Sequence, residues 1–283
     1  MIYPAAITPR RPNEVSIDIA AALELIDFLE SYKVDGLTLL GSTGEFLHFT
    51  PEDRMRYVTM AVKRAHVPVL VNASHSTLDA AIAIGQQAAA DGAAGVLIMP
   101  PGYFRYGQEF IMAYMMEFAA QVKAPVYLYQ IPQFTSGMVL QTMLDLLATG
   151  VFAGIKDSSG NWDDFVELQR AAPRFFTGAD AQYSRMLKNG AYGAISGVAS
   201  VVPELMVAID RRARAGEDTS ALDAKVADFI DRSAAFPFPI GIREACAVRG
   251  IKTGPHAGPL GRQECLEMEE FRAWFSDWHK SLF

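Results

Sequence analysis

The sequence predicts an α/β fold, a (β/α)8 TIM barrel followed by a C-terminal helical extension. Short runs rich in Val, Ile, Leu and aromatic residues alternate with longer stretches whose apolar residues recur at helical spacing, as in βα units around a parallel sheet. Eight such units fit into residues 1–216, a length typical of a closed barrel. No GxGxxG motif opens a helix, which disfavours a doubly wound dinucleotide-binding sheet.

Each expected strand is a short apolar run that ends near polar or glycine-rich residues. In chain order, the expected strands are 2–7, 36–40, 67–72, 95–99, 126–131, 152–156, 175–178 and 193–196. A segment with helical periodicity follows each of them, so the order of elements is strand and helix in regular alternation.

Two of the expected helices have recognisable starts. Thr50 precedes Pro51 and two carboxylates, a pattern in which the hydroxyl caps the helix and the carboxylates meet its positive end. Asn161 precedes Asp163 and Asp164 in the same way.

The last barrel helix is expected at 203–216, and further helical segments follow it. Gly-Pro pairs at 254–255 and 258–259 interrupt these segments. We therefore assign residues 1–216 to the barrel and 217–283 to a helical extension that is not an independent domain.

Composition excludes several classes of function. The net charge of −7 and the pI near 5.3 disfavour binding to nucleic acid or to an anionic membrane. No apolar run is long enough to span a bilayer, and the first residues lack the basic region of an export signal. Cys246 and Cys265 show no CxxC spacing, which predicts a reducing, cytoplasmic setting without a disulfide framework.

Lys156 is the first candidate catalytic residue, because it ends an apolar strand, Val151-Phe152-Ala153-Gly154-Ile155-Lys156. In a barrel the carboxyl ends of the strands carry the active site. Desolvation disfavours the ammonium form of a lysine there and frees the amine to attack a ketone. The alternative interpretation is a structural ion pair with Asp180 or Glu45.

Three other segments lie at expected strand ends. The glycine-flanked loop 41–45 (GSTGE) offers backbone N–H groups to a carboxylate or phosphate, or it is simply a turn. Tyr127 and Tyr129 share one face of a strand, and Tyr129 is close enough to the strand end to shuttle protons, although a packed tyrosine is equally compatible. The loop 99–104 (MPPGYF) presents aromatic residues for packing or for a subunit contact.

The histidines show no HxH or HExxH spacing, so no metal site is predicted. His48 and His75 follow strands and are candidates for substrate contact, although a lone loop histidine is more often incidental.

Together these segments resemble the dihydrodipicolinate synthase and N-acetylneuraminate lyase family, class I aldolases that handle pyruvate on a (β/α)8 barrel with a C-terminal helical extension. The resemblance covers nearly the whole chain and depends on the order and spacing of its motifs. These motifs are GSTGE at 41–45, Tyr129-x-x-Pro132, GIKD at 154–157, TGAD at 177–180 and GAISG at 193–197.

The resemblance implies specific roles. Lys156 is the expected Schiff-base lysine, Tyr129 the proton shuttle and Thr43 the hydroxyl that positions Tyr129. Ser42 and Thr43 are expected to bind the pyruvate carboxylate. Tyr103 matches a tyrosine that reaches into the neighbouring subunit's site in many relatives, which implies a homodimer or homotetramer. The remaining expected substrate-binding residues are Gly178, Asp180, Ile195 and Phe134.

The implied chemistry needs neither a metal nor an organic cofactor, because the iminium nitrogen formed on the lysine is the electron sink. The expected substrate is pyruvate or a 2-oxo acid that yields pyruvate.

Two departures from the family pattern concern the second half of the substrate. Phe134 stands where dihydrodipicolinate synthases typically carry an arginine, and Ala181 stands where sialic acid lyases usually carry a glutamate. A 2-keto-3-deoxy sugar acid or a related 2-oxo acid is therefore the expected substrate. The absence of the arginine also leaves room for a more apolar or aromatic aldehyde, as the hydratase-aldolase relatives use.

Two alternatives stay open. The chain is a dihydrodipicolinate synthase in which Arg105 replaces the missing arginine, or it is a non-catalytic protein that senses a 2-oxo acid. A phosphate-binding or flavin barrel has less support, because the glycines at 193–197 have no basic residue beside them.

Overall fold

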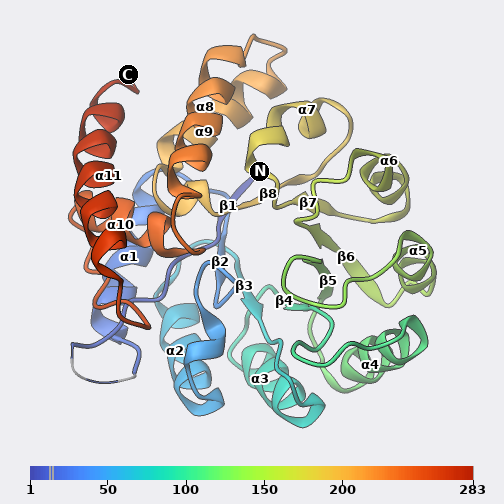
Figure 1. Ribbon diagram of the computed structural model, residues 1–283. Helices are drawn as coiled ribbons and strands as arrows, with labels where there is room; N and C mark the ends of the chain where they lie inside the picture. The colour runs from blue at the N-terminus through green and yellow to red at the C-terminus, as the bar shows by residue number, and fades with distance from the viewer. Residues whose placement is uncertain (13, 15, 283) are drawn as a thin grey trace.

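The computed structural model describes residues 1–12, 14 and 16–282, and it confirms the predicted eight-stranded barrel (Figure 1). The parallel sheet runs in the order β1-β8-β7-β6-β5-β4-β3-β2. A parallel bridge between Ala5 and Thr38, together with the bond from the Ala6 N–H to the Thr38 carbonyl (2.9 Å), joins β1 to β2 and closes the barrel. The strands are β1 Ile2–Pro4, β2 Leu37–Leu39, β3 Val69–Asn72, β4 Gly95–Ile98, β5 Val126–Gln130, β6 Phe152–Asp157, β7 Phe175–Thr177 and β8 Gly193–Ser196.

A ring of helices surrounds the strands in Figure 1. The barrel helices are α1 Ile19–Ser31, α2 Pro51–Arg64, α3 Leu78–Ala90, α4 Gln108–Gln121, α5 Leu140–Ala148, α6 Trp162–Ala171, α7 Tyr183–Lys188 and α8 Pro203–Arg214. Both predicted helix starts are confirmed: the Thr50 hydroxyl accepts a bond from the Asp53 N–H (3.2 Å), and the Asn161 side chain accepts bonds from Asp163 and Asp164 (3.0 and 3.2 Å). Short 3-10 turns occur at Phe46–His48, Asp180–Gln182 and Val198–Ser200, each after a strand.

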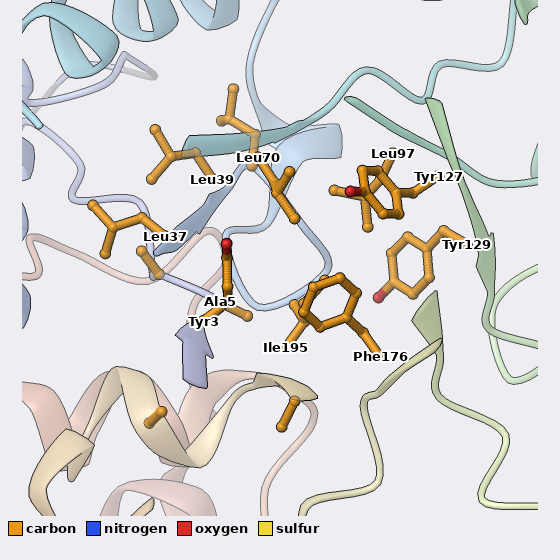
Figure 2. Close-up of a cluster of buried hydrophobic side chains, with 14 of the residues drawn as sticks. Tyr3, Ala5, Leu37, Leu39, Leu70, Leu97, Tyr127, Tyr129, Phe176 and Ile195 are labelled. Carbon is orange, nitrogen blue, oxygen red and sulfur yellow. The ribbon is translucent and has the colours of Figure 1, made fainter. Parts of the chain in front are cut away.

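The interior of the barrel is filled by alternate residues of the strands. Figure 2 shows Tyr127 and Tyr129 leaving β5 toward the same side, where they meet Leu97, Phe176 and other buried side chains. Glycines adjust this packing, since a β-carbon at Gly95 would lie 2.8 Å from the Tyr127 ring. The large rings therefore need small residues on neighbouring strands.

The extension consists of α9 Ser220–Ser233, α10 Ile240–Val248 and α11 Arg262–Lys280. Its helices pack through aromatic residues, with the Phe229 ring 5.8 Å from Phe275 and 5.6 Å from Trp278 between centroids. Among the helices of the described residues, none combines the length and the apolar character needed to cross a membrane.

Candidate active site

A cavity of about 510 Å³ lies at the carboxyl ends of the strands, between the barrel and the extension. This is the face where barrel enzymes carry their catalytic residues. It brings together all the residues to which the family resemblance assigns a role except Tyr103, and its lining includes Ser42, Thr43, Tyr129, Phe134, Lys156, Gly178, Asp180 and Ile195. Their roles in binding and catalysis stay predictions.

A local irregularity in β6 is associated with the inward direction of Lys156. Val126 pairs with Phe152, but the next residue, Tyr127, pairs with Gly154, so Ala153 is an extra residue in β6. Beyond this bulge Tyr129 pairs with Lys156. Because successive side chains of a strand alternate in direction, the one-residue shift changes which side chains of β6 face the barrel interior.

The Lys156 side chain is 4% exposed, and its Nζ lies 4.1 Å from the centroid of the Tyr129 ring. Glu45, one of the two suggested ion-pair partners, is instead held by Arg10 (3.3 Å) and Arg243 (2.9 Å). Across residues 1–12, 14 and 16–282, Lys156 forms no ion pair within 4.0 Å. The structural ion-pair interpretation of this lysine is therefore not supported.

The buried Tyr129 hydroxyl shares a hydrogen bond of 3.1 Å with Ser42 Oγ. The family resemblance implies Thr43 for this contact, whereas the structure places the neighbouring residue, Ser42, there. Thr43 Oγ1 instead lies 3.5 Å from the position that a β-carbon at Gly197 would occupy. The two residues lie beyond the end of β2, so no strand periodicity fixes which hydroxyl turns toward the tyrosine.

Gly178, which follows β7, provides space for the lysine side chain. A β-carbon at this position would lie 2.1 Å from Ser158 Oγ and 3.3 Å from Lys156 Cε. The first distance is far below a normal contact, so a larger residue would displace the groups around the amine.

Asp180 is the other charged residue that lines the cavity. Its Oδ2 accepts a bond from the Val198 N–H (2.9 Å), whereas its buried Oδ1 has no hydrogen-bond partner among the described residues. Burial raises the pKa of Asp180 to about 6, and the Val198 N–H and the positive charge of Lys156 partly oppose this rise.

The extension contributes residues to the cavity that no sequence pattern had indicated. Phe229, Ile230, Phe236, Phe238 and Ile242 all line it. The only sequence signal was the Phe-Pro-Phe-Pro run at 236–239, since helical periodicity does not reveal which loop folds over the barrel mouth.

Tyr103 lies outside this cavity, with 92% of its surface exposed and a left-handed backbone (φ 74°). It lines a second cavity of about 460 Å³ that also contains His48 and His75. Arg105, the suggested replacement for the missing arginine, is exposed and lines neither cavity.

The fold and this cavity define the chain as a (β/α)8-barrel enzyme with its site at the carboxyl ends of the strands. It belongs to the dihydrodipicolinate synthetase family, whose model matches residues 1–276. As a member of this family it is a lyase of the class I aldolase type.

Relatives of known sequence support this assignment. The chain is 31% identical over 272 residues to an uncharacterized DapA-like lyase of Halobacterium salinarum, covering 92% of this chain and 87% of the relative. It is 30% identical over 281 residues to a 4-hydroxy-tetrahydrodipicolinate synthase of Moorella thermoacetica, covering 96% of both.

Solved structures share the fold. A dihydrodipicolinate synthase from Aquifex aeolicus superposes with a TM-score of 0.91 at 24% identity, covering 98% of this chain and 97% of the other. A sialic acid aldolase from Ruminococcus gnavus, solved as a catalytic lysine mutant, gives 0.90 at 20% identity, covering 100% and 97%.

Proposed function

We propose that the protein binds pyruvate, or a 2-oxo acid that yields pyruvate, as a Schiff base on Lys156 and makes or breaks the adjacent carbon–carbon bond. One observation carries this proposal: a buried amine without an ion-pair partner lies beside Tyr129 in a cavity at the carboxyl ends of the strands. An amine that no carboxylate holds is free to approach and attack a carbonyl carbon bound in the cavity.

The reaction begins when the Lys156 amine attacks the ketone carbon and the resulting carbinolamine loses water to give an iminium. Loss of a proton from the adjacent methyl group then gives an enamine, because the iminium nitrogen accepts the electron pair. The enamine carbon adds to an aldehyde, the new alkoxide takes up a proton, and water releases the product from the lysine. The reverse sequence cleaves the bond.

Tyr129 is the proposed acid and base for these steps, assisted by the hydroxyl of Ser42 that bonds it. Thr43 stays a candidate for the same relay, and both hydroxyl residues are candidates for holding the pyruvate carboxylate. Gly178, Ile195 and Asp180 are the proposed walls of the donor and acceptor sites.

The proposed substrate is a 2-keto-3-deoxy sugar acid or a related 2-oxo acid. Two solved structures of similar fold, the YagE protein of E. coli K12 and the dihydrodipicolinate synthase of Acinetobacter baumannii, contain pyruvate, which supports the donor half. Dihydrodipicolinate synthase activity is the second candidate, favoured by relatives of that name such as the 32% identical protein of Salinibacter ruber. Phe134 in place of an arginine disfavours it.

The working assembly is proposed to be a homodimer or homotetramer in which Tyr103 completes a neighbouring site. The extension at 217–283 is proposed to act as a wall of the barrel's site. The proposed compartment is the cytoplasm, in keeping with the free thiols of Cys246 and Cys265.

Borohydride reduction in the presence of pyruvate tests the proposal directly. The expected result is a stable adduct on the peptide that contains Lys156, found by peptide mass mapping. Lys156→Arg keeps a positive charge but lacks the nucleophilic amine, so it should give no adduct on this peptide. An unmodified Lys156 peptide at saturating pyruvate would overturn the proposal.

Screening 2-oxo acids for released pyruvate then separates an enzyme from a sensor that only binds. Complementation of a strain that requires lysine tests the dihydrodipicolinate synthase alternative.

A further inference from the structure

We infer that the acceptor end of the cavity selects an uncharged aldehyde with a flat apolar body, and that Phe238 acts with Phe134 as the residue pair that makes this selection. The inference rests on the proposed Schiff base at Lys156 and specifies the chemical class of the second reactant. Phe238 belongs to the extension, so part of the specificity would come from outside the barrel.

The charge of the cavity excludes an anionic acceptor. Of the described residues that line it, only Lys156 and Asp180 carry charged side chains. The lining of the adjoining second cavity, within the part of the chain that the structure describes, contains no arginine or lysine. A carboxylate or phosphate on the acceptor would therefore lose water without gaining a cation, because Lys156 is occupied by the donor.

The Asp180 carboxylate adds to this exclusion. It lies in the same cavity, and near neutral pH it would repel a second negative charge. An uncharged acceptor meets no such penalty.

Two aromatic rings face each other at the cavity from different parts of the chain. Phe134 comes from the loop between β5 and α5, and Phe238 from the loop between α9 and α10. Their ring centroids are 5.9 Å apart at 33°, and the side chains are 54% and 51% exposed. Exposed apolar side chains that cluster are typical of ligand grooves or protein interfaces. Because both rings line the cavity that holds Lys156, we assign them to the ligand groove.

Because the side chains of Phe134 and Phe238 are exposed, part of the surface of each ring is free to contact a third ring. Aromatic pairs are favourable at centroid separations of about 4.5–7 Å, so a planar acceptor can pack against Phe134 and Phe238 with little rearrangement. The wall below them is apolar as well, since Phe236 and Ile242 line the same side. The polar side chains of the lining, Gln133, Ser158, Gln182 and Ser233, can bind the hydroxyls of a sugar-derived acceptor, but only an aromatic acceptor also packs against Phe134 and Phe238. Among the proposed 2-oxo acids we therefore expect one with an aromatic or apolar tail to react faster.

The corresponding reaction balances without another reactant. The methyl carbon of pyruvate loses a proton and bonds to the aldehyde carbon, and the aldehyde oxygen gains a proton. The product is a 4-hydroxy-2-oxo acid that contains all atoms of both reactants.

The test compares pyruvate addition to benzaldehyde, 4-carboxybenzaldehyde and glyceraldehyde, with the 4-hydroxy-2-oxo acid products measured by chromatography. We expect kcat/KM for benzaldehyde to exceed that for 4-carboxybenzaldehyde by about 100-fold and that for glyceraldehyde by about 10-fold. Phe238→Ala should lower kcat/KM for benzaldehyde by about 10-fold, whereas Leu266→Ala, an exposed apolar residue on α11 outside the cavity, should not. Phe134→Arg should raise the relative use of 4-carboxybenzaldehyde by at least about 10-fold.

Borohydride trapping of pyruvate on Lys156 is measured in the same variants. Adducts in all of them show that the donor site is intact, so altered aldehyde use then reports on the acceptor site alone. If adducts form but the acid or glyceraldehyde reacts as fast as benzaldehyde, or no aldehyde reacts, the inference is wrong while the Schiff base stands. If wild type forms no adduct, the proposed function itself fails.

Discussion

At the scale of single residues, the location of the Lys156 amine depends on two glycines. A β-carbon at Gly154 would lie 2.1 Å from the Arg174 carbonyl oxygen, which accepts a bond from the Ile155 N–H (2.9 Å). Gly154 therefore allows β7 to approach β6 at the bulge. Gly178 leaves the space that the methylenes of Lys156 and the Ser158 hydroxyl occupy.

Substituting Gly178 should impair the chemistry without changing any group proposed to react. The β-carbon in Gly178→Ala would lie 3.3 Å from Lys156 Cε and collide with Ser158 Oγ, so the amine should shift. A shift of about 1 Å is enough to lower kcat/KM by roughly 100-fold. Steady-state kinetics and the rate of borohydride trapping with pyruvate measure the effect.

Gly258→Ala is the matched control, since nothing lies within 4 Å of a β-carbon at Gly258. Its activity should match wild type. Wild-type trapping rates in Gly178→Ala would show that the lysine does not need this space.

The sequence alone indicates Lys156 as a candidate for the site, because an apolar strand that ends on a lysine is unusual. It did not predict that Ser42, rather than Thr43, contacts the Tyr129 hydroxyl. Strand periodicity covers Tyr129 and Lys156, which lie within strands, but the direction of a loop hydroxyl depends on dihedral angles that no pattern encodes. Leu40 and Glu45, at either side of this loop, both have left-handed backbones.

At the scale of elements, a buried ion cluster ties the loop after β2 to the extension. Glu45 contacts Arg10, from the segment after β1, and Arg243, from α10. The Arg243 guanidinium also donates to the carbonyls of Thr8 (3.0 Å) and Thr253 (2.7 Å). Burial lowers the pKa of Arg243, and the Glu45 carboxylate opposes this. The cluster therefore holds the Ser42 loop and α10 in one arrangement.

Removing the central carboxylate should destabilise this arrangement strongly. Glu45→Gln leaves two buried guanidinium groups without a counter-charge, which should cost about 3–5 kcal/mol in the free energy of unfolding. Urea unfolding measures the loss, and weaker pyruvate binding should accompany it because the Ser42 loop is released.

Glu24→Gln provides the comparison. Glu24 pairs with Lys252 at 2.8 Å, but both side chains are exposed, so the cost should stay below about 1 kcal/mol. Equal costs for the two variants would contradict a structural role for the Glu45 cluster.

The elements themselves were largely predictable, whereas their irregularities were not. All eight strands appear where short apolar runs alternate with segments of helical periodicity, because this alternation is typical of βα units. The first strand differs in length, since β1 ends at Pro4 and not at residue 7. The bulge at Ala153 and the position of Phe238 over the cavity were not predicted. Both result from contacts between distant segments, which local periodicity cannot reveal.

At the scale of the whole molecule, the extension shares in the site. Figure 1 shows α9, α10 and α11 grouped on one side of the barrel, beside α1 and α8. Phe229 from α9 and Ile242 from α10 line the same cavity as Lys156. We therefore keep the boundary at 216/217 as a proposal about the limits of the barrel, with the site formed by both parts.

A continuous aromatic surface outside the cavity bears on assembly. Tyr103 and Phe104 are 4.9 Å apart between ring centroids, and Tyr106 stacks on Phe110 at 4.2 Å. Tyr103, Phe104 and Phe110 are exposed, as is Leu47, which lines the second cavity with Tyr103. We give the name aromatic surface to these four residues together with Tyr106. Exposed apolar surface of this kind favours burial against another chain.

We expect the wild-type protein to be a dimer or larger in light scattering, with the aromatic surface buried between copies. Phe104→Asp places a charge in that interface and should weaken association by about 2 kcal/mol or more, roughly 30-fold in Kd, giving monomers at low micromolar concentration. Leu266→Asp introduces the same charge at an exposed apolar residue on α11 and should leave the assembly intact. Because Tyr103 is proposed to complete a neighbouring site, the Phe104→Asp monomer should also lose activity while keeping its fold by circular dichroism. A monomeric wild-type protein, or a fully active Phe104→Asp monomer, would show that each chain carries a complete site.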